Sequence, residues 1–247
     1  MVQKSLKFLL ISGVFILSII LSSDFSQARE IEVLQQGLEK TFNSKNKNEL
    51  FNLFSEEIAK DISQRFDAFI KVFPDASWNI KFLKDLKDER KLLEITVKGS
   101  KKRHSQNYKL ISKQKIAITI NNGKVIKKES FSDYSILKSG NKMLDVTVQI
   151  PDAVLTGSMY DIDIILEEPL EDSIIAGGLI AISGQKTKSS EKELELMPMG
   201  SGGIFKSARA PLKPGEHRLA ALIAHPQGLI SITKKIRIVS SPSELKP

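Results

Sequence analysis

The side chains of this 247-residue chain that could do chemistry together are mostly lysines. Between Ile95 and Lys128 the sequence holds ten basic residues and no acidic one. Seven of them are candidates for an anion-binding surface: Lys98, Lys101, Lys102, Arg103, Lys109, Lys113 and Lys115. Such a surface would attract lipid headgroups, a polysaccharide or an acidic protein, with up to ~1 kcal/mol per lysine near an anionic membrane. The alternative is a solvated sheet face, on which lysine discourages edge-to-edge aggregation.

A second group of residues is a candidate for lining a pocket: Trp78, Tyr108, Ser112, Gln114 and Glu129. Ser112 and Gln114 share strand parity with apolar residues, and buried polar groups need partners such as water or a ligand. A β-bulge that changes the parity would instead place both outside. Glu129 and Asp133 could form an inward carboxylate pair for acid–base chemistry. The alternative for Glu129 is a solvated or salt-bridged role, since charged residues are mostly exposed.

No motif in the sequence predicts a metal site, a cofactor or nucleophilic catalysis. The chain has no cysteine. His217 and His225 flank one expected strand and would lie about 26 Å apart at ~3.3 Å per residue, too far to share a metal. The glycine-rich segment 200–207 fails as a phosphate loop, because Phe205 stands where a glycine must precede Lys206. We therefore predict no catalytic residue, no metal and no cofactor.

The first 28 residues predict export. Lys4 and Lys7 precede an apolar run at 8–21, and Ser26 and Ala28 supply the small residues of a signal-peptidase site. We predict cleavage after Ala28 and a soluble protein in the periplasm or another extracytoplasmic compartment. A retained N-terminal membrane anchor is the alternative, although the run is short for a span of ~20 residues. Export, and the lack of aromatic residues among the lysines, argue against nucleic acid as a partner.

The periodicity of apolar residues predicts the elements that must position these side chains. Spacings of three and four residues predict helices between Ile31 and Phe73, and Pro74 ends the last one. After Pro74 the period changes to two, which predicts an antiparallel meander ending at Leu137, with Asn122-Gly123 as the turn of its last hairpin. The sequence thus predicts an α+β domain with helices on one face of a curved sheet.

The second half of the chain has a different texture. From Leu144 onward about seven short strands separated by turn segments predict an antiparallel sandwich. The net charge is +8 over residues 29–140 and −1 over residues 141–247. We predict a signal peptide at 1–28, an α+β domain at 29–140, a β-sandwich at 141–240 and a flexible tail at 241–247.

Both halves resemble known families. Three helices, Pro74, a strand containing Trp78 and the closing hairpin NNGKVIKKESFSDYSIL resemble the nuclear transport factor two-like (SnoaL-like) cone fold. The segment PLKPGEHRLAALIAHPQGLISITKKIRIV is similar to the last two strands of bacterial immunoglobulin-like domains. The resemblances imply a cone of three helices on a curved antiparallel sheet, followed by an all-β immunoglobulin-like sandwich. Neither implies an activity, because both folds host many functions.

These observations favour an exported, non-catalytic binding or scaffold protein of the cell envelope. Its cone would offer a pocket for a small apolar ligand or a face for a homodimer, and its basic outer sheet would meet an anionic partner. The alternative is a small-molecule enzyme of the isomerase, dehydratase or hydrolase type, working inside the cone with Gln114, Tyr108 or Glu129. The enzyme requires an inward ionisable group within hydrogen-bond reach of a second polar group.

Overall fold

The computed structural model describes residues 29–167, 174–182, 194–200 and 202–247, so the predicted signal peptide lies outside the described residues. Residues 29–44 are helical, and η1 (Lys47–Glu49), α2 (Leu50–Leu53) and α3 (Glu56–Val72) follow, with η2 (Pro242–Glu244) near the end. The strands are β1 (Ser77–Asp85), β2 (Lys91–Arg103), β3 (Gln106–Asn121), β4 (Lys124–Gly140), β5 (Val146–Gln149), β6 (Ala153–Leu155), β7 (Met159–Leu166), β8 (Ala176–Ile182), β9 (Met197–Pro198), β10 (Gly203–Arg209), β11 (Gly215–His225) and β12 (Gly228–Val239).

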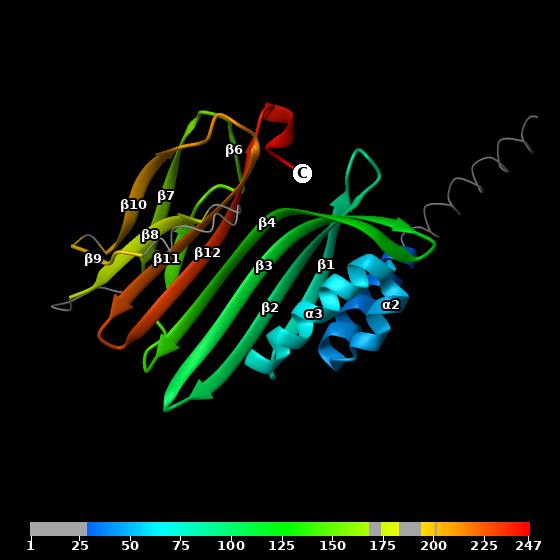
Figure 1. Ribbon diagram of the computed structural model, residues 1–247, viewed down its shortest axis with the longest axis horizontal. Coiled ribbons are helices and arrows are strands. Elements are labelled where there is room, and N and C mark those ends of the chain that lie inside the picture. Colours follow the sequence, from blue (N-terminus) through cyan, green and yellow to red (C-terminus); the bar gives the residue numbers. More distant parts are fainter. Residues whose placement is uncertain (1–28, 168–173, 183–193, 201) are drawn as a thin grey trace, which may run out of the picture.

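One long sheet crosses the whole described molecule. Its strand order is β1-β2-β3-β4-β12-β11-β8-β9, and β6 pairs in parallel with β12, which makes nine strands. A second sheet has three strands in the order β10-β7-β5. Figure 1 shows the helices at one end of the long sheet and the three-stranded sheet at the other.

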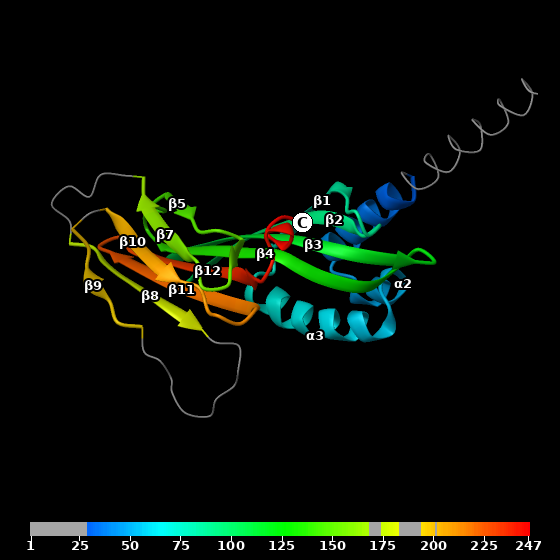
Figure 2. The same ribbon diagram turned by 90° about the horizontal axis from the view of Figure 1, so that it is seen from above.

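The two ends of the long sheet are covered on opposite faces. Successive side chains of a strand point to opposite faces, and on β4 the neighbours Ile136 and Leu137 belong to different cores. Leu137 packs with the helices, against Phe66 and Trp78. Ile136 packs with the three-stranded sheet, against Ile164. Figure 2 shows α3 on one side of the sheet and β5, β7 and β10 on the other. We call the side of Leu137 the helix face and the side of Ile136 the far face.

The 29–44 helix lies along the edge strand β1 and accepts hydrogen bonds from three of its N–H groups. Backbone N–H groups of Trp78, Ile80 and Phe82 donate to side-chain oxygens of Asn43, Glu39 and Gln35 at 2.9, 2.9 and 3.0 Å. The spacings match, because four helical residues rise ~6.0 Å and two strand residues ~6.8 Å. The edge of the sheet is therefore capped by side chains of one helix stripe.

Strand β4 joins the two halves by pairing with both β3 and β12. Its pairing with β12 runs from Gly140 opposite Gly228 to Asp133 opposite Lys235. The glycine pair allows the closest approach, because a Cβ on Gly228 would lie 1.8 Å from the carbonyl oxygen of Ser139, and Gly140 has a φ of +121°. No side chain larger than hydrogen fits there without a shift of the backbone.

The predicted cone was wrong. The described part of the chain is mostly antiparallel β sheet with three α-helices before β1, and the predicted α+β class holds only in that coarse sense. The sheet does not close around the helices as a domain of the nuclear transport factor two-like type. Instead, the free edge of β4 pairs with β12, and the sheet runs on through β11 and β8. Extension costs little, because an unpaired strand edge is a ready partner for another strand.

The predicted immunoglobulin-like sandwich was also wrong. Strands β12, β11, β8 and β9 continue the sheet of the first half, and only β10, β7 and β5 form a separate sheet opposite them. Short strands with alternating apolar and polar residues predict two packed layers. The pattern does not predict which strands share a sheet. The division of the chain near residue 140 stays a prediction from its sequence.

Candidate anion-binding site

The seven basic candidates do not form one surface. Val97 and Leu110 pack on the helix face, so alternation places five of the seven on the far face: Lys98, Lys102, Lys109, Lys113 and Lys115. Lys101 lies on the helix face, with its Nζ 5.0 Å from the ring centroid of Phe73 and 5.2 Å from that of Tyr108. Arg103 is exposed at the same hairpin end. We call the five far-face residues the lysine face.

The lysine face carries unbalanced positive charge. Within the described parts of the chain none of its five ammonium groups forms an ion pair, and all but Lys115 are exposed. On the neighbouring edge strand, Asn79 and Lys81 point to the same side and are exposed. On β2, one acidic residue, Glu94, also points to the far face, and it lies opposite Lys115. The helices cover only the other face, so this face meets solvent.

Where β5 rises over the sheet, the lysine face ends in a cleft of about 320 Å³, which we call the lysine cleft. Its basic side is formed by Lys113 and Lys115, and Val148 and Ile150 form an apolar wall. The floor includes Tyr134, directly opposite Lys113 across β3 and β4. The cleft thus combines positive charge, a phenol and an apolar wall.

A buried lysine lies beneath the lysine cleft. Lys234 is 7% exposed and forms an ion pair with Asp152. The hydroxyl of Ser132 donates to Asp152 Oδ1 at 2.7 Å. Burial alone would raise the pKa of Asp152, but hydrogen bonds from Lys234 and Ser132, with attraction to Lys234 and Lys115, hold it below the ordinary value. Lys234 and Asp152 therefore form an ion pair with no net charge.

Tyr134 stays protonated at neutral pH. Burial raises the pKa of its hydroxyl to about 12. The ring centroid lies 6.0 Å from Nζ of Lys234. The phenol is therefore a hydrogen-bond donor in the lysine cleft.

The five pocket candidates are not brought together. Trp78 is buried in an aromatic core, with its ring 5.9 Å from that of Phe42, and Tyr108 donates to Gln106 at 3.2 Å. Ser112 lies on the helix face opposite Val97. None of these three lines the lysine cleft.

Gln114 and Glu129 lie on opposite sides of the sheet. Gln114 is on the helix face, where its Nε2 donates to Asp133 Oδ1 at 3.3 Å, and it also borders the lysine cleft. The sheet does contain bulges, but the extra residues, Ile126 and Phe131, are on β4, so the parity of β3 is unbroken. Glu129 points to the far face opposite Ala117 and is exposed. Glu129 and Asp133 therefore form no carboxylate pair.

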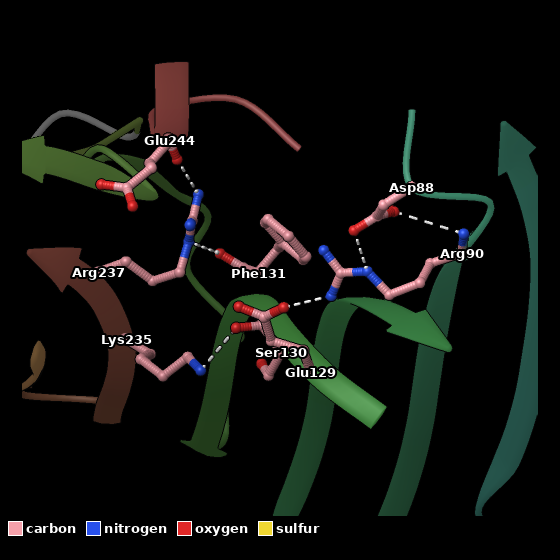
Figure 3. Close-up of polar contacts among 8 residues, drawn as sticks. All are labelled: Asp88, Arg90, Glu129, Ser130, Phe131, Lys235, Arg237 and Glu244. Atoms are coloured by element: carbon pink, nitrogen blue, oxygen red, sulfur yellow. Dashed lines mark hydrogen bonds and ion pairs between the residues drawn. The ribbon is translucent and has the colours of Figure 1, made fainter. Parts of the chain in front are cut away.

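Glu129 lines a second and larger cleft of about 790 Å³, where β4 and β12 separate; we call it the junction cleft (Figure 3). Arg90 forms ion pairs with Glu129 and, at 2.7 Å, with Asp88. The ring of Phe131 lies between two guanidinium groups, 5.6 Å from that of Arg90 and 4.5 Å from that of Arg237. The bulge at Phe131 places this ring there.

Two further cations at or near the junction cleft, Arg237 and Lys235, make contacts within the chain. Arg237 donates to the carbonyl oxygens of Phe131 at 3.3 Å and Glu244 at 3.0 Å, and burial lowers its pKa. Lys235 donates to the carbonyl oxygen of Ser130 and to Glu216, both at 2.8 Å. The contact of Arg237 with Glu244 also fixes η2, in the segment predicted to be a flexible tail. These contacts join the two halves at the junction cleft, which Lys84, Lys87 and Lys246 also line.

Sequence reasoning missed the residues under the lysine cleft. Lys234 shares strand parity with Ile230, Ile232, Ile236 and Ile238, all buried. A lysine in a row of isoleucines indicates a buried charge that needs a counter-ion. The sequence held that signal, whereas nothing local to Asp152 identified it as the partner.

Among the described residues, no group of three or more histidine, cysteine, aspartate or glutamate side chains could hold a metal ion. In the described part of the chain, no helix has the length and apolar composition needed to cross a membrane.

A protein-family model matches the second half of the chain. Residues 141–239 match a family model described as a domain of unknown function (DUF8623). This family is neither of the two that the sequence resembled. No curated protein matches the chain. The matched segment begins directly after β4, so it supplies the wall of the lysine cleft and Lys234, whereas Lys113, Lys115 and Tyr134 precede it.

Proposed function

We propose that this protein is a non-catalytic binding protein that meets an anionic partner through the lysine face. The observation that supports the proposal is five lysines on one uncovered sheet face, with no ion pair among the described residues. In this proposal the chain is exported, as its first 28 residues predict, and the partner lies outside the cytoplasm.

The charges on the helix side argue against a merely solvating role for these lysines. On α3, Lys60 pairs with Glu56 at 2.6 Å, and Arg65 with Asp61 at 2.6 Å. Lys128 of β4 also reaches Asp61, at 3.2 Å. A surface that serves only solubility mixes both signs in this way. The five lysines of the lysine face meet one acid of β2 on that side, Glu94, and a concentration of one sign on a face attracts a counter-charged partner.

The spacing of the lysine face favours an extended partner. Lys113 and Lys115 are two residues apart, ~6.8 Å along the strand, and neighbouring strands are ~4.8 Å apart. Charges distributed over β2 and β3 suit the headgroups of an anionic membrane or the repeating acid groups of a polysaccharide. The enzyme hypothesis depended on a site inside the cone, so it is not carried forward.

Co-sedimentation with vesicles tests the proposal. Residues 29–247 are mixed with vesicles containing phosphatidylglycerol, and separately with a soluble acidic polysaccharide, at several salt concentrations. At ~1 kcal/mol per lysine, the variant Lys98→Glu/Lys109→Glu/Lys113→Glu should bind at least about 100-fold more weakly to whichever probe the wild type binds. Wild-type binding should also weaken as salt rises.

The matched control is Lys40→Glu/Lys206→Glu/Lys213→Glu, which makes the same charge change at exposed lysines away from the lysine face. It should lower binding only by the general effect of net charge. Equal losses in the two variants, or no binding of either probe by the wild type, would contradict the proposed function.

A further inference from the structure

We infer that the lysine cleft is a subsite for one phosphate group, held by Lys113, Lys115 and Tyr134. The inference rests on the proposed function, because it names the chemical group that the lysine face takes at its inner end. It adds a defined site to what is otherwise a diffuse charged surface.

Several donor side chains meet in the lysine cleft because of the strand register. Lys113, Tyr134 and Lys234 lie opposite one another across β3, β4 and β12, and Lys115 lies opposite Ser132 in the next row. These side chains line one cleft of about 320 Å³. That volume is at the lower end of ligand sites, which suits a headgroup rather than a large cofactor.

The donors differ in whether they are already occupied. Lys234 and the Ser132 hydroxyl are committed to Asp152. Lys113 and Lys115 make no ion pair, and the Tyr134 hydroxyl no hydrogen bond, with any part of the chain that the structure describes. The ammonium group of Lys234 is therefore already paired, and the two ammonium groups of Lys113 and Lys115 remain for a ligand with the phenol of Tyr134.

The donor set favours phosphate over carboxylate. Lysine binds phosphate as a point charge, and it lacks the planar fork with which arginine pairs bidentately with a carboxylate. No arginine lines the lysine cleft. A tetrahedral phosphate offers several oxygens to donors that arrive from different directions. The apolar wall of Val148 and Ile150 would contact the glycerol or sugar carbons attached to it.

Glu94 gives the site a distinctive signature. Its carboxylate lines the lysine cleft, opposite Lys115, and forms no ion pair among the described residues. A carboxylate next to a bound phosphate repels it, so removal of this charge should strengthen binding.

The inference is tested by NMR titration of residues 29–247 at low salt with inorganic phosphate, glycerol 3-phosphate and acetate. We expect both phosphates to shift the signals of Tyr134 and its neighbours. Lys113→Gln/Lys115→Gln should weaken phosphate binding at least about 10-fold, Tyr134→Phe about 3-fold, and Glu94→Gln should strengthen it about 2- to 5-fold. The control Lys98→Gln/Lys109→Gln removes the same charge elsewhere on the lysine face and should leave it within about 2-fold.

Vesicles distinguish the source of the phosphate. Tighter binding to phosphatidylglycerol vesicles than to glycerol 3-phosphate identifies a lipid headgroup, and equal affinity identifies a soluble phosphate. Equal binding of acetate, equal losses in the two glutamine pairs, or no shift at Tyr134 would overturn the subsite. Loss of vesicle binding in the triple glutamate variant without phosphate binding in the lysine cleft would leave the proposed function standing and remove only the subsite.

Discussion

Lys234 illustrates how a single charged residue is accommodated in this fold. An ammonium group in a row of isoleucines is costly unless a counter-charge and hydrogen bonds compensate for its lost hydration. Asp152 supplies the charge, and Ser132 of β4 donates a further hydrogen bond to that carboxylate. The network therefore connects β12 and β4 with the segment that follows β5.

Substitution of Asp152 should be more harmful than substitution of Lys234. Asp152→Asn leaves a buried ammonium without its counter-charge, and we expect it to lower the free energy of unfolding by about 1–3 kcal/mol. Lys234→Met should cost less, because the remaining Asp152 side chain is 41% exposed and can be hydrated. Urea denaturation at pH 7 measures both. The reverse order would contradict this account of the pair.

The same pair predicts a pH dependence. Because the pKa of Asp152 is lowered in the folded state, its contribution to stability is complete above the unfolded value of about 3.9 and is lost as pH falls through the lower folded value. The stability difference between wild type and Asp152→Asn should thus be constant from about pH 7 to 5 and shrink below about pH 4. A difference that persisted unchanged at pH 2 would contradict the lowered pKa.

Among the elements, the 29–44 helix has a role that its apolar stripe does not reveal. Ile31, Leu34 and Leu38 pack into the core, as their spacing predicts. A second stripe of the helix, of polar residues, serves the edge of β1. An uncovered edge would offer these N–H groups to a strand of another molecule.

Removal of this polar stripe should destabilise the fold and expose the edge. For Gln35→Ala/Glu39→Ala/Asn43→Ala we expect a loss of about 1–3 kcal/mol in unfolding free energy and association that grows with concentration. Denaturation and light scattering measure the two effects. The control Glu32→Ala/Gln36→Ala/Lys40→Ala changes the exposed side of the same helix. Similar results for both triples would show that the caps add nothing specific.

At the scale of the whole molecule, the long sheet combines the two halves that the sequence distinguishes. The segment that matches the family model contributes β12, β11, β8 and β9, and the preceding segment contributes β1 to β4. Their contact is a strand pairing reinforced by the junction cleft, where Arg90 and Arg237 enclose Phe131. The lysine cleft exists only because both halves are present.

Much of the local structure could be predicted from the sequence, because it depends on neighbouring residues. The period changes at Pro74 where helix gives way to strand, and Asn122 and Gly123 both adopt the positive φ of the expected turn, +50° and +72°. The alternation that places Lys113 and Lys115 away from the helices is likewise local.

The long-range pairings could not be predicted in this way. A sheet that closes into a cone and a sheet that runs on into further strands need the same alternating pattern in β3 and β4. β4 and β12 meet at Ser135 and Thr233, which are 98 positions apart in the sequence. Asp152 and Lys234 are 82 positions apart. The resemblance to known families failed at that step.

Mapping the lysines that a bound partner protects tests the lysine face most directly. Residues 29–247 are acetylated with and without phosphatidylglycerol vesicles or the acidic polysaccharide, and the modified lysines are identified by mass spectrometry. We expect protection of Lys98, Lys102, Lys109 and Lys113, with Lys40, Lys206 and Lys213 modified equally in both samples. Protection of the second set, or uniform protection of both, would contradict this expectation.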